Sequence, residues 1–218
     1  TNLRRPTVIA VDGPAASGKG TLSSKLASHL DFSRLDTGLI YRALGLKVLV
    51  DGTDPNDNEK VILIANQLSF DDLNQEDLRS EKIGDVASRV AAIPDVREVL
   101  LNFQRNFAAN PPADKAGVVL DGRDIGTIVC PDAHFKIFLI ADKEVRAARR
   151  FKELQERGSK AIYTRILRDI VERDARDAFR SVAPLKPAKD AFVLDTSNLS
   201  VDATFVAALE YISTQNED

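Results

Sequence analysis

The sequence has almost none of the residues that form disulfides or bind transition metals. Cys130 is its only cysteine, and His29 and His134 are its only histidines. One cysteine excludes an intramolecular disulfide framework and a cysteine-based zinc site, and two histidines argue against a histidine-rich metal site. We therefore expect a protein of a reducing, cytoplasmic compartment that holds no metal directly.

The sequence also lacks an excess of one charge and any long hydrophobic run. Its 30 lysines and arginines nearly balance 33 aspartates and glutamates, so no overall field favours nucleic acid or an anionic membrane. The N-terminal residues have no signal-peptide apolar core, and no later run approaches the length of a membrane span. We expect an ordinary globular protein of 218 residues, monomeric, with small-molecule partners and neither nucleic acid nor membrane as a partner.

What the sequence does have is an alternation of short apolar runs and helical stretches. This pattern predicts an α/β fold with a parallel sheet of about five strands flanked by helices. The expected strands are Thr7–Val11, Phe32–Leu35, Gly117–Leu120, Phe135–Ile140 and Phe192–Leu194. The expected helices are Lys19–Leu30, Leu39–Leu49, Pro94–Asn110, Asp142–Arg157, Ile162–Arg180 and Val201–Thr214. Most of the strands are continuous apolar runs, as expected for strands buried on both faces.

Two regions depart from this alternation. Residues 51–93 separate two core elements by far more than one helix, which predicts an inserted subdomain. Residues 142–180 predict two highly charged helices, and they hold nine of the chain's eighteen arginines. Because the overall charge is balanced, this local concentration is informative.

The clearest motif is GPAASGKGT, in which Gly13 and Gly18 have the spacing of a phosphate-binding P-loop and Lys19 follows. A strand precedes the motif and a helix follows it, so backbone N–H groups, the helix N-terminus and the ammonium group are expected to hold the phosphates of a nucleoside triphosphate. The usual Ser or Thr after the lysine is replaced by Gly20, and the hydroxyl comes at Thr21. This ending resembles the nucleoside monophosphate kinase group more than GTPases or motor ATPases. The alternative is a glycine-rich turn without a ligand.

The second motif, LDTGLIYR, repeats the order of strand, turn and helix. Asp36 or Thr37 can cap the helix. Tyr41 and Arg42 fall in its first turns, where the guanidinium could reach an anion near the helix start. Taken alone, an ordinary cap and a solvated arginine explain the motif.

The third motif, VVLDGRDIGT, ends an apolar strand in Asp121 and then offers Arg123 and Asp124. A carboxylate at such a strand end is typical of a residue that orients magnesium through water. Strand-end aspartates also cap turns, and Arg123 beside Asp124 could be a local ion pair of little energetic value. Position favours a functional role, because this motif and the second one leave strands expected to flank the first, where ligands of open α/β sheets bind.

The stretch ERDARDAFR places Arg173, Asp177 and Arg180 on one helical face. A stripe of three isoleucines is expected to anchor the same helix: Ile162, Ile166 and Ile170. The pattern fits an exposed helix with salt bridges. It equally fits a mobile flap whose guanidinium groups stabilise a migrating phosphoryl group and exclude water.

Taken together, these motifs closely resemble the bacterial cytidylate kinase family. The matching pieces are DGPAASGKGT, LDTGLIYR, ASRVAAIPDVRE, LDGRDIGT, KIFLIA and ERDARDAFRSVAPLKPA, in the family's order across nearly the whole chain. The resemblance implies a P-loop kinase that transfers a phosphoryl group in line from ATP, with Mg²⁺, to CMP or dCMP. It also implies a core domain of residues 1–50, 94–141 and 181–218, an acceptor-binding insert of residues 51–93 and a helical lid of residues 142–180.

The resemblance further implies a role for each motif residue. The residues expected to bind ATP are Gly13, Pro14, Ala15, Ala16, Ser17, Gly18, Lys19, Gly20 and Thr21. Those expected to bind CMP are Thr37, Tyr41, Arg42, Ser88, Arg97, Arg123, Asp124, Arg173, Asp177 and Arg180, with Ser88, Arg97 and Asp124 at the cytosine edge. Catalysis is assigned to Lys19, Arg123, Arg173 and Arg180. Thr21 and Asp121 are the candidates to meet the magnesium of ATP through water.

One segment departs from the family pattern. FDDLNQEDLRS, from Phe70 to Ser80, is shorter than the β-rich stretch that the family insert usually carries, so a hairpin is trimmed here. This leaves open how the acceptor subdomain closes and how ribonucleotides and deoxyribonucleotides are ranked.

Two other functions stay open. A P-loop kinase for a different acceptor would show no preference for cytosine. A nucleotide-binding switch of the GTPase type would carry an Asn-Lys-x-Asp or Thr-Lys-x-Asp guanine reader, and neither motif occurs in the sequence.

Overall fold

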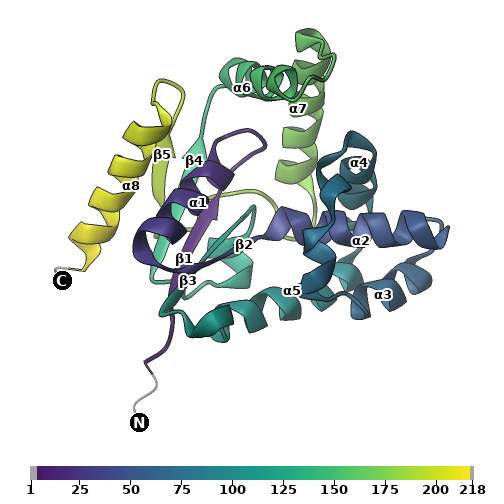
Figure 1. The fold of residues 1–218 in the computed structure, drawn as a ribbon, viewed down its shortest axis with the longest axis horizontal. Helices are drawn as coiled ribbons and strands as arrows, with labels where there is room; N and C mark the ends of the chain where they lie inside the picture. Colours follow the sequence, from purple (N-terminus) through teal and green to yellow (C-terminus); the bar gives the residue numbers. More distant parts are fainter. Residues whose placement is uncertain (1–3, 217–218) are drawn as a thin grey trace. The chain divides into compact units, whose positions relative to one another are not determined.

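The computed structural model describes residues 4–216, in which five strands form one sheet (Figure 1). The strands are β1 (Thr7–Asp12), β2 (Ser33–Asp36), β3 (Gly117–Gly122), β4 (Phe135–Ile140) and β5 (Phe192–Asp195). Their order across the sheet is β2-β3-β1-β4-β5, with β1 parallel to both β3 and β4 and β4 parallel to β5. The predicted α/β fold with a parallel sheet of about five strands is therefore confirmed.

The two strands at the centre of the sheet are buried almost completely. Every residue of β3 is buried, and so is every residue of β1 after the first. Helices α1 (Lys19–Leu30) and α8 (Val201–Gln215) contact each other, and their Leu26 and Ile212 share one apolar cluster with Ile137 of β4. Burial on both faces explains why these strands are continuous apolar runs. Because β1 and β3 are parallel, the residues that follow them emerge at the same edge of the sheet.

The chain divides into two compact units, each described here by itself. The sheet unit consists of the described residues up to Leu35 and from Asn110 on. Besides α1, α8 and the strands, it holds η3 (Pro112–Asp114), a single π-helical turn η4 (Ile125–Val129), α6 (Lys143–Glu156) and α7 (Tyr163–Phe179). The charged helices α6 and α7 contact each other within this unit.

The helical unit spans Asp36–Ala109. Its elements are α2 (Thr37–Asp51), α3 (Asn58–Asn66), the 3₁₀ helices η1 (Phe70–Asn74) and η2 (Glu76–Arg79), α4 (Glu81–Val90) and α5 (Pro94–Ala109). Helix α2 contacts α3, α4 and both 3₁₀ helices, and α5 packs on α3. This unit is wider than the insert expected at 51–93, because α2 and α5 pack against the helices of that segment.

The predicted helices and strands form close to their expected positions, and Pro94 begins α5 as expected. Asp142 is the N-cap residue of α6, but its side chain makes no capping hydrogen bond. The apolar stripe of α7 was predicted one turn too long, because Ile162 is the half-exposed N-cap residue and only Ile166 and Ile170 are buried. Within residues 4–216, no helix has both the length and the apolarity needed to cross a membrane.

Candidate active site

The loop between β1 and α1 has the backbone of a phosphate-binding loop. Ala16 and Gly18 both adopt left-handed φ angles, of 58° and 93°, which turn the chain sharply into the helix. Gly18 is the N-cap residue of α1, so the N–H groups of the first helical turn have no partner inside the helix. Lys19 begins the helix, and its Nζ donates to the carbonyl oxygen of Pro14 at 3.2 Å. Backbone N–H groups, a helix N-terminus and an ammonium group are thus gathered in one loop, which suits a polyphosphate.

Close packing around the loop explains its first glycine. A Cβ atom at Gly13 would lie 2.7 Å from the carbonyl oxygen of Leu139 and 2.8 Å from Ser17 Oγ, so no other residue fits. The buried Thr196, which follows β5, donates from Oγ1 to the carbonyl oxygen of Ser17 at 3.2 Å. Arg149 in turn donates from Nη1 to Thr196 Oγ1 at 3.1 Å. The loop is therefore held from two other strand ends.

Helices α6 and α7 also support the loop. Arg146 of α6 is only 5% exposed, and it binds Asp174 of α7 through two hydrogen bonds, of 2.9 and 2.6 Å. The same guanidinium donates to the carbonyl oxygen of Ala15 at 3.3 Å. Next to it, Ala16 packs on an apolar cluster of both helices that includes Ile170. The arginine-rich helices thus contact the P-loop directly.

The predicted arginine face of α7 is partly wrong in its geometry. The helix ends at Phe179, and Arg180 is the C-cap residue with extended dihedral angles (φ −63°, ψ 143°), so it does not continue the face of Arg173 and Asp177. Asp177 and Arg180 nevertheless lie close to each other and to Arg123. Arg123 donates from Nε to Asp177 at 3.1 Å, and Arg180 Nη1 lies 4.0 Å from the same carboxylate. Arg123, Asp177 and Arg180 are therefore neighbours.

The end of β3 carries two buried carboxylates. Asp121 is bound by Arg34 of β2, whose Nε and Nη2 both lie 3.1 Å from Asp121 Oδ2. Asp124 is the N-cap residue of the π-helical turn η4 and is also buried. The local ion pair considered for Arg123 and Asp124 is not the one that Arg123 forms, because its guanidinium pairs with Asp177 on α7.

In the helical unit, Arg42 of α2 binds backbone carbonyl groups just before the start of α4. Its Nη1 donates to the carbonyl oxygens of Leu78 and Ser80, at 2.9 and 3.0 Å. A Cβ atom at Gly84 would lie 2.8 Å from Arg42 Nη2, so a glycine allows the guanidinium to lie against α4. Arg42 is thus held by backbone atoms rather than freely solvated.

The other predicted residues of this unit lie on α2, α4 and α5. Arg97 of α5 is 8% exposed, lies 5.3 Å from the ring centre of Tyr41 and donates to the carbonyl oxygen of Ala91 at 3.2 Å. Thr37 is buried at the start of α2, and Ser88 is half-buried on α4. Because α2 packs on α4, the two motifs that supply these residues belong to one packed group of helices. A buried arginine beside an aromatic ring is a costly arrangement that suits recognition of a planar polar group.

Comparison with known proteins identifies the family. The family model described as cytidylate kinase matches residues 9–214. A cytidylate kinase of Paramagnetospirillum magneticum is 57% identical over 209 residues, which cover 96% of this chain and 99% of the relative. A cytidylate kinase of Methylocella silvestris is 50% identical over 210 residues, which cover 96% of this chain and 95% of the relative.

The chain belongs to the cytidylate kinase family. Among solved structures, an uncharacterized protein from Eubacterium ventriosum matches 96% of this chain and 99% of its own, with a TM-score of 0.55 and 14% identity. At this identity the likeness shows the fold alone.

The predicted site residues fall into two sets. The nine P-loop residues lie in the sheet unit, together with Arg123, Asp124, Arg173, Asp177 and Arg180. The helical unit holds Thr37, Tyr41, Arg42, Ser88 and Arg97. The first set contains every residue assigned to ATP, and the second contains only residues assigned to the acceptor.

Sequence analysis missed one buried carboxylate at the start of the P-loop. Asp12, the last residue of β1, accepts hydrogen bonds from the N–H groups of Ile125 and Gly126, at 2.9 and 2.8 Å. The pKa of Asp12 is raised to about 7, chiefly by burial and in part by Asp124, although the two N–H groups and Lys19 lower it. The sequence feature that could have indicated Asp12 is an acidic residue at the end of a buried apolar strand, next to a phosphate-binding motif.

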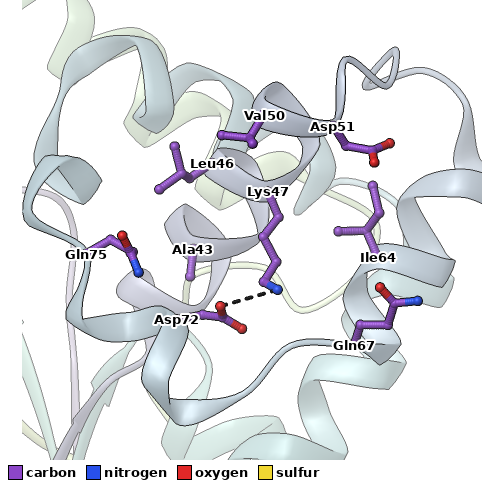
Figure 2. Close-up of a pocket in the computed structure, with 9 residues that line it drawn as sticks. All are labelled: Ala43, Leu46, Lys47, Val50, Asp51, Ile64, Gln67, Asp72 and Gln75. Carbon is purple, nitrogen blue, oxygen red and sulfur yellow. Dashed lines mark ion pairs between the residues drawn. The ribbon is translucent and has the colours of Figure 1, made fainter.

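A second feature that the sequence did not predict is a cavity of about 420 Å³ in the helical unit (Figure 2). Its lining residues are Ala43, Leu46, Lys47, Val50, Asp51, Ile64, Gln67, Asp72 and Gln75. Figure 2 shows Lys47 and Asp72 facing each other, and their charged groups lie 3.2 Å apart. None of the lining residues is among those expected to bind CMP.

Proposed function

We propose that this protein transfers the γ-phosphoryl group of ATP to the phosphate of CMP and dCMP, which gives CDP or dCDP and ADP. The observation that carries the proposal is a P-loop with the geometry of a polyphosphate site in a chain that belongs to the cytidylate kinase family. The relatives that share about half of its residues over nearly their whole length bear that name. Their activity is the reason to test this acceptor first.

On this proposal, the P-loop holds the triphosphate. Lys19 and the N–H groups at the start of α1 bind the β- and γ-phosphates, and they stabilise the charge that develops on the migrating group. No strong general base is required, because the acceptor phosphate is already anionic near neutral pH. The rate would depend on positioning and electrostatics.

Magnesium is expected to arrive with ATP. It would neutralise part of the charge on the phosphate oxygens. The donor set fits this role: Thr21 offers a hydroxyl in the first turn of α1, and Asp121 offers a buried carboxylate at the end of β3. Arg34 binds one oxygen of Asp121, so a contact through water suits this residue better than direct coordination. Within residues 4–216, no cluster of three His, Cys, Asp or Glu side chains could hold a metal ion alone.

We propose acceptor-binding residues in each of the two units. In the helical unit, Ser88 and Arg97 would recognise cytosine, and Thr37, Tyr41 and Arg42 the phosphate and sugar of CMP. In the sheet unit, Asp124 would accept from the cytosine amino group, and Arg123, Arg173, Asp177 and Arg180 would bind the ribose and phosphate side. The support for this assignment is the match of the chain to the cytidylate kinase family over residues 9–214.

We also propose that the protein works as a monomer on these small molecules. A cytoplasmic location stays a prediction from the single cysteine.

The proposal is tested by measuring ADP release with ATP and each nucleoside monophosphate in turn. Turnover should require an acceptor, and CMP and dCMP should give the highest kcat/KM. Equal use of all monophosphates would contradict the acceptor assignment. ADP release that does not depend on any acceptor would contradict the transferase assignment.

A further inference from the structure

The carboxylate of Asp12 binds the turn that follows β3, far away in the sequence. Asp12 is the last residue of β1 and is only 5% exposed. Its Oδ1 accepts the N–H of Ile125 at 2.9 Å, and its Oδ2 accepts the N–H of Gly126 at 2.8 Å. Those two residues begin the π-helical turn whose N-cap residue is Asp124.

A carboxylate is the side chain best suited to this position. The first N–H groups of a helical turn lack partners inside it, and burial makes such groups costly to leave unbonded. An ionised carboxylate only accepts hydrogen bonds, so one group can satisfy both donors at once. Packing around the second donor is close, since a Cβ atom at Gly126 would lie 3.2 Å from Cδ of Lys136 and 3.5 Å from Asp12 Oδ2.

The same two loops are joined by a second contact. The N–H of Gly13, the first residue of the P-loop, donates to the carbonyl oxygen of Gly122 at 3.3 Å. Arg123 and Asp124 therefore lie between two attachment points, one at Gly122 and one at the pair that Asp12 binds. Any change in the second attachment should move these two side chains relative to the P-loop.

We propose that Asp12 is a positioning residue that holds Arg123 and Asp124 in the geometry needed for the acceptor nucleotide. The inference rests on the proposed function, since it is there that Arg123 and Asp124 are assigned to CMP. Asp12 itself touches neither substrate: it acts through the backbone of the turn.

The charges around Asp12 make this contact sensitive to pH near neutrality. Its pKa is raised to about 7, chiefly by burial and in part by the neighbouring Asp124, although the two N–H groups and the ammonium group of Lys19 lower it. From β4, Lys136 places its methylenes beside Gly126, while its Nζ is bound by Asp190 and the carbonyl oxygen of Pro131. As the pH falls through about 7, the carboxyl group takes up a proton and one of its oxygens becomes a donor. One of the two N–H groups then loses its acceptor.

The contact between Asp12 and the turn at Ile125 and Gly126 can be tested without measuring enzyme activity. In the pH titration of the wild-type protein, the amide signals of Ile125 and Gly126 should shift in NMR spectra with a common midpoint near pH 7. The same shifts should be absent in Asp12→Asn. Amide signals that do not move between pH 5 and 9 in the wild type would overturn the proposal even if the variant failed to fold.

The link to the acceptor is tested by kinetics with Asp12→Asn. This substitution keeps the shape of the side chain but replaces one acceptor oxygen by a donor. At pH 8, KM for CMP should rise about tenfold or more, which is the size expected for one buried donor left unbonded, while KM for ATP stays within about twofold. Lowering the pH from 8 to 6 should raise KM for CMP in the wild type more than in the variant. CMP itself also takes up a proton in this range, but this changes KM equally in both proteins, so comparing them isolates the effect of Asp12.

Asp132→Asn is the matched control. Asp132 lies in the same connection between β3 and β4, but it is exposed and pairs with Arg5, so its substitution should leave both KM values unchanged. An equal rise of KM for ATP and for CMP in Asp12→Asn would overturn the proposal, and so would no rise in either. If the wild type did not phosphorylate CMP but the amide titration was observed, the proposed function would fail while the contact stood.

Discussion

Several charged side chains on the strands are buried and are bound by specific partners. Asp12 is bound by two N–H groups, Asp121 by Arg34 and Lys136 by Asp190. Burial of a charge disfavours the charged form unless such partners compensate. Asp12 is the residue where compensation is incomplete, since its pKa is raised to about 7.

This raised pKa predicts the pH dependence of stability. The pKa of Asp12 rises from 3.8 to about 7 on folding, so its contribution to stability is fully present below pH 3.8 and is lost as the pH rises through 7. Between pH 4 and 8, the wild type should therefore lose about 4 kcal/mol of unfolding free energy relative to Asp12→Asn. Urea denaturation of both proteins across this range measures the difference. A difference that does not change with pH would contradict the assignment.

Lys19 should be essential for transfer but not for folding. Its Nζ reaches the carbonyl oxygen of Pro14 across the P-loop, so Lys19→Ala removes an ammonium group that is aimed into this turn. We expect kcat/KM to fall by about a hundredfold or more, with the thermal unfolding midpoint nearly unchanged. Lys25→Ala on the same helix is the control, because Lys25 is half-exposed and pairs with the exposed Asp202. If Lys19→Ala turned over as fast as this control, the P-loop would take no part in the reaction and the assignment would be wrong.

At the scale of elements, α6 and α7 are joined by a charged pair at the P-loop. Arg146 is buried and bonded to both Asp174 and the carbonyl oxygen of Ala15. Asp174→Ala would leave a buried guanidinium without its carboxylate, which should cost about 2 to 4 kcal/mol of unfolding free energy. Asp169→Ala, on an exposed position of the same helix, should cost little. Equal losses in urea denaturation of the two variants would show that the pair does not stabilise these helices.

The elements themselves could be predicted from the sequence, because their signals are local. Continuous apolar runs marked the central strands, and the glycine spacing with Lys19 marked the P-loop. The contact between Asp12 and the pair Ile125 and Gly126 could not be predicted, since it joins residues more than a hundred positions apart. The pair of Arg146 and Asp174, 28 positions apart on two helices, could not be predicted either, because the periodicity of one helix does not show which residues of two helices meet. The expectation for Arg180 failed because helical periodicity was extended past Phe179, where the helix ends.

At the scale of the whole molecule, the residues assigned to the two substrates are divided between the units. All P-loop residues belong to the sheet unit, while Ser88 and Arg97 belong to the helical unit. Changes in the helical unit should therefore affect the acceptor and leave ATP binding intact.

Ser88→Ala tests this division. Ser88 is half-buried on α4, and the loss of one hydrogen bond to cytosine should raise KM for CMP by about three- to tenfold. The dissociation constant of ATP, measured by calorimetry, should not change. Lys82→Ala, at an exposed position of the same helix, is the control for both measurements. A weakened affinity for ATP in Ser88→Ala alone would contradict the division.

The central claim is tested most directly by the fate of the transferred phosphoryl group. The protein is incubated with CMP and ATP labelled at the γ-phosphate, and the products are separated. We predict that the label appears in the β-phosphate of CDP, at a rate that depends on CMP and is lost in Lys19→Ala. Label released as inorganic phosphate without formation of CDP would contradict the claim.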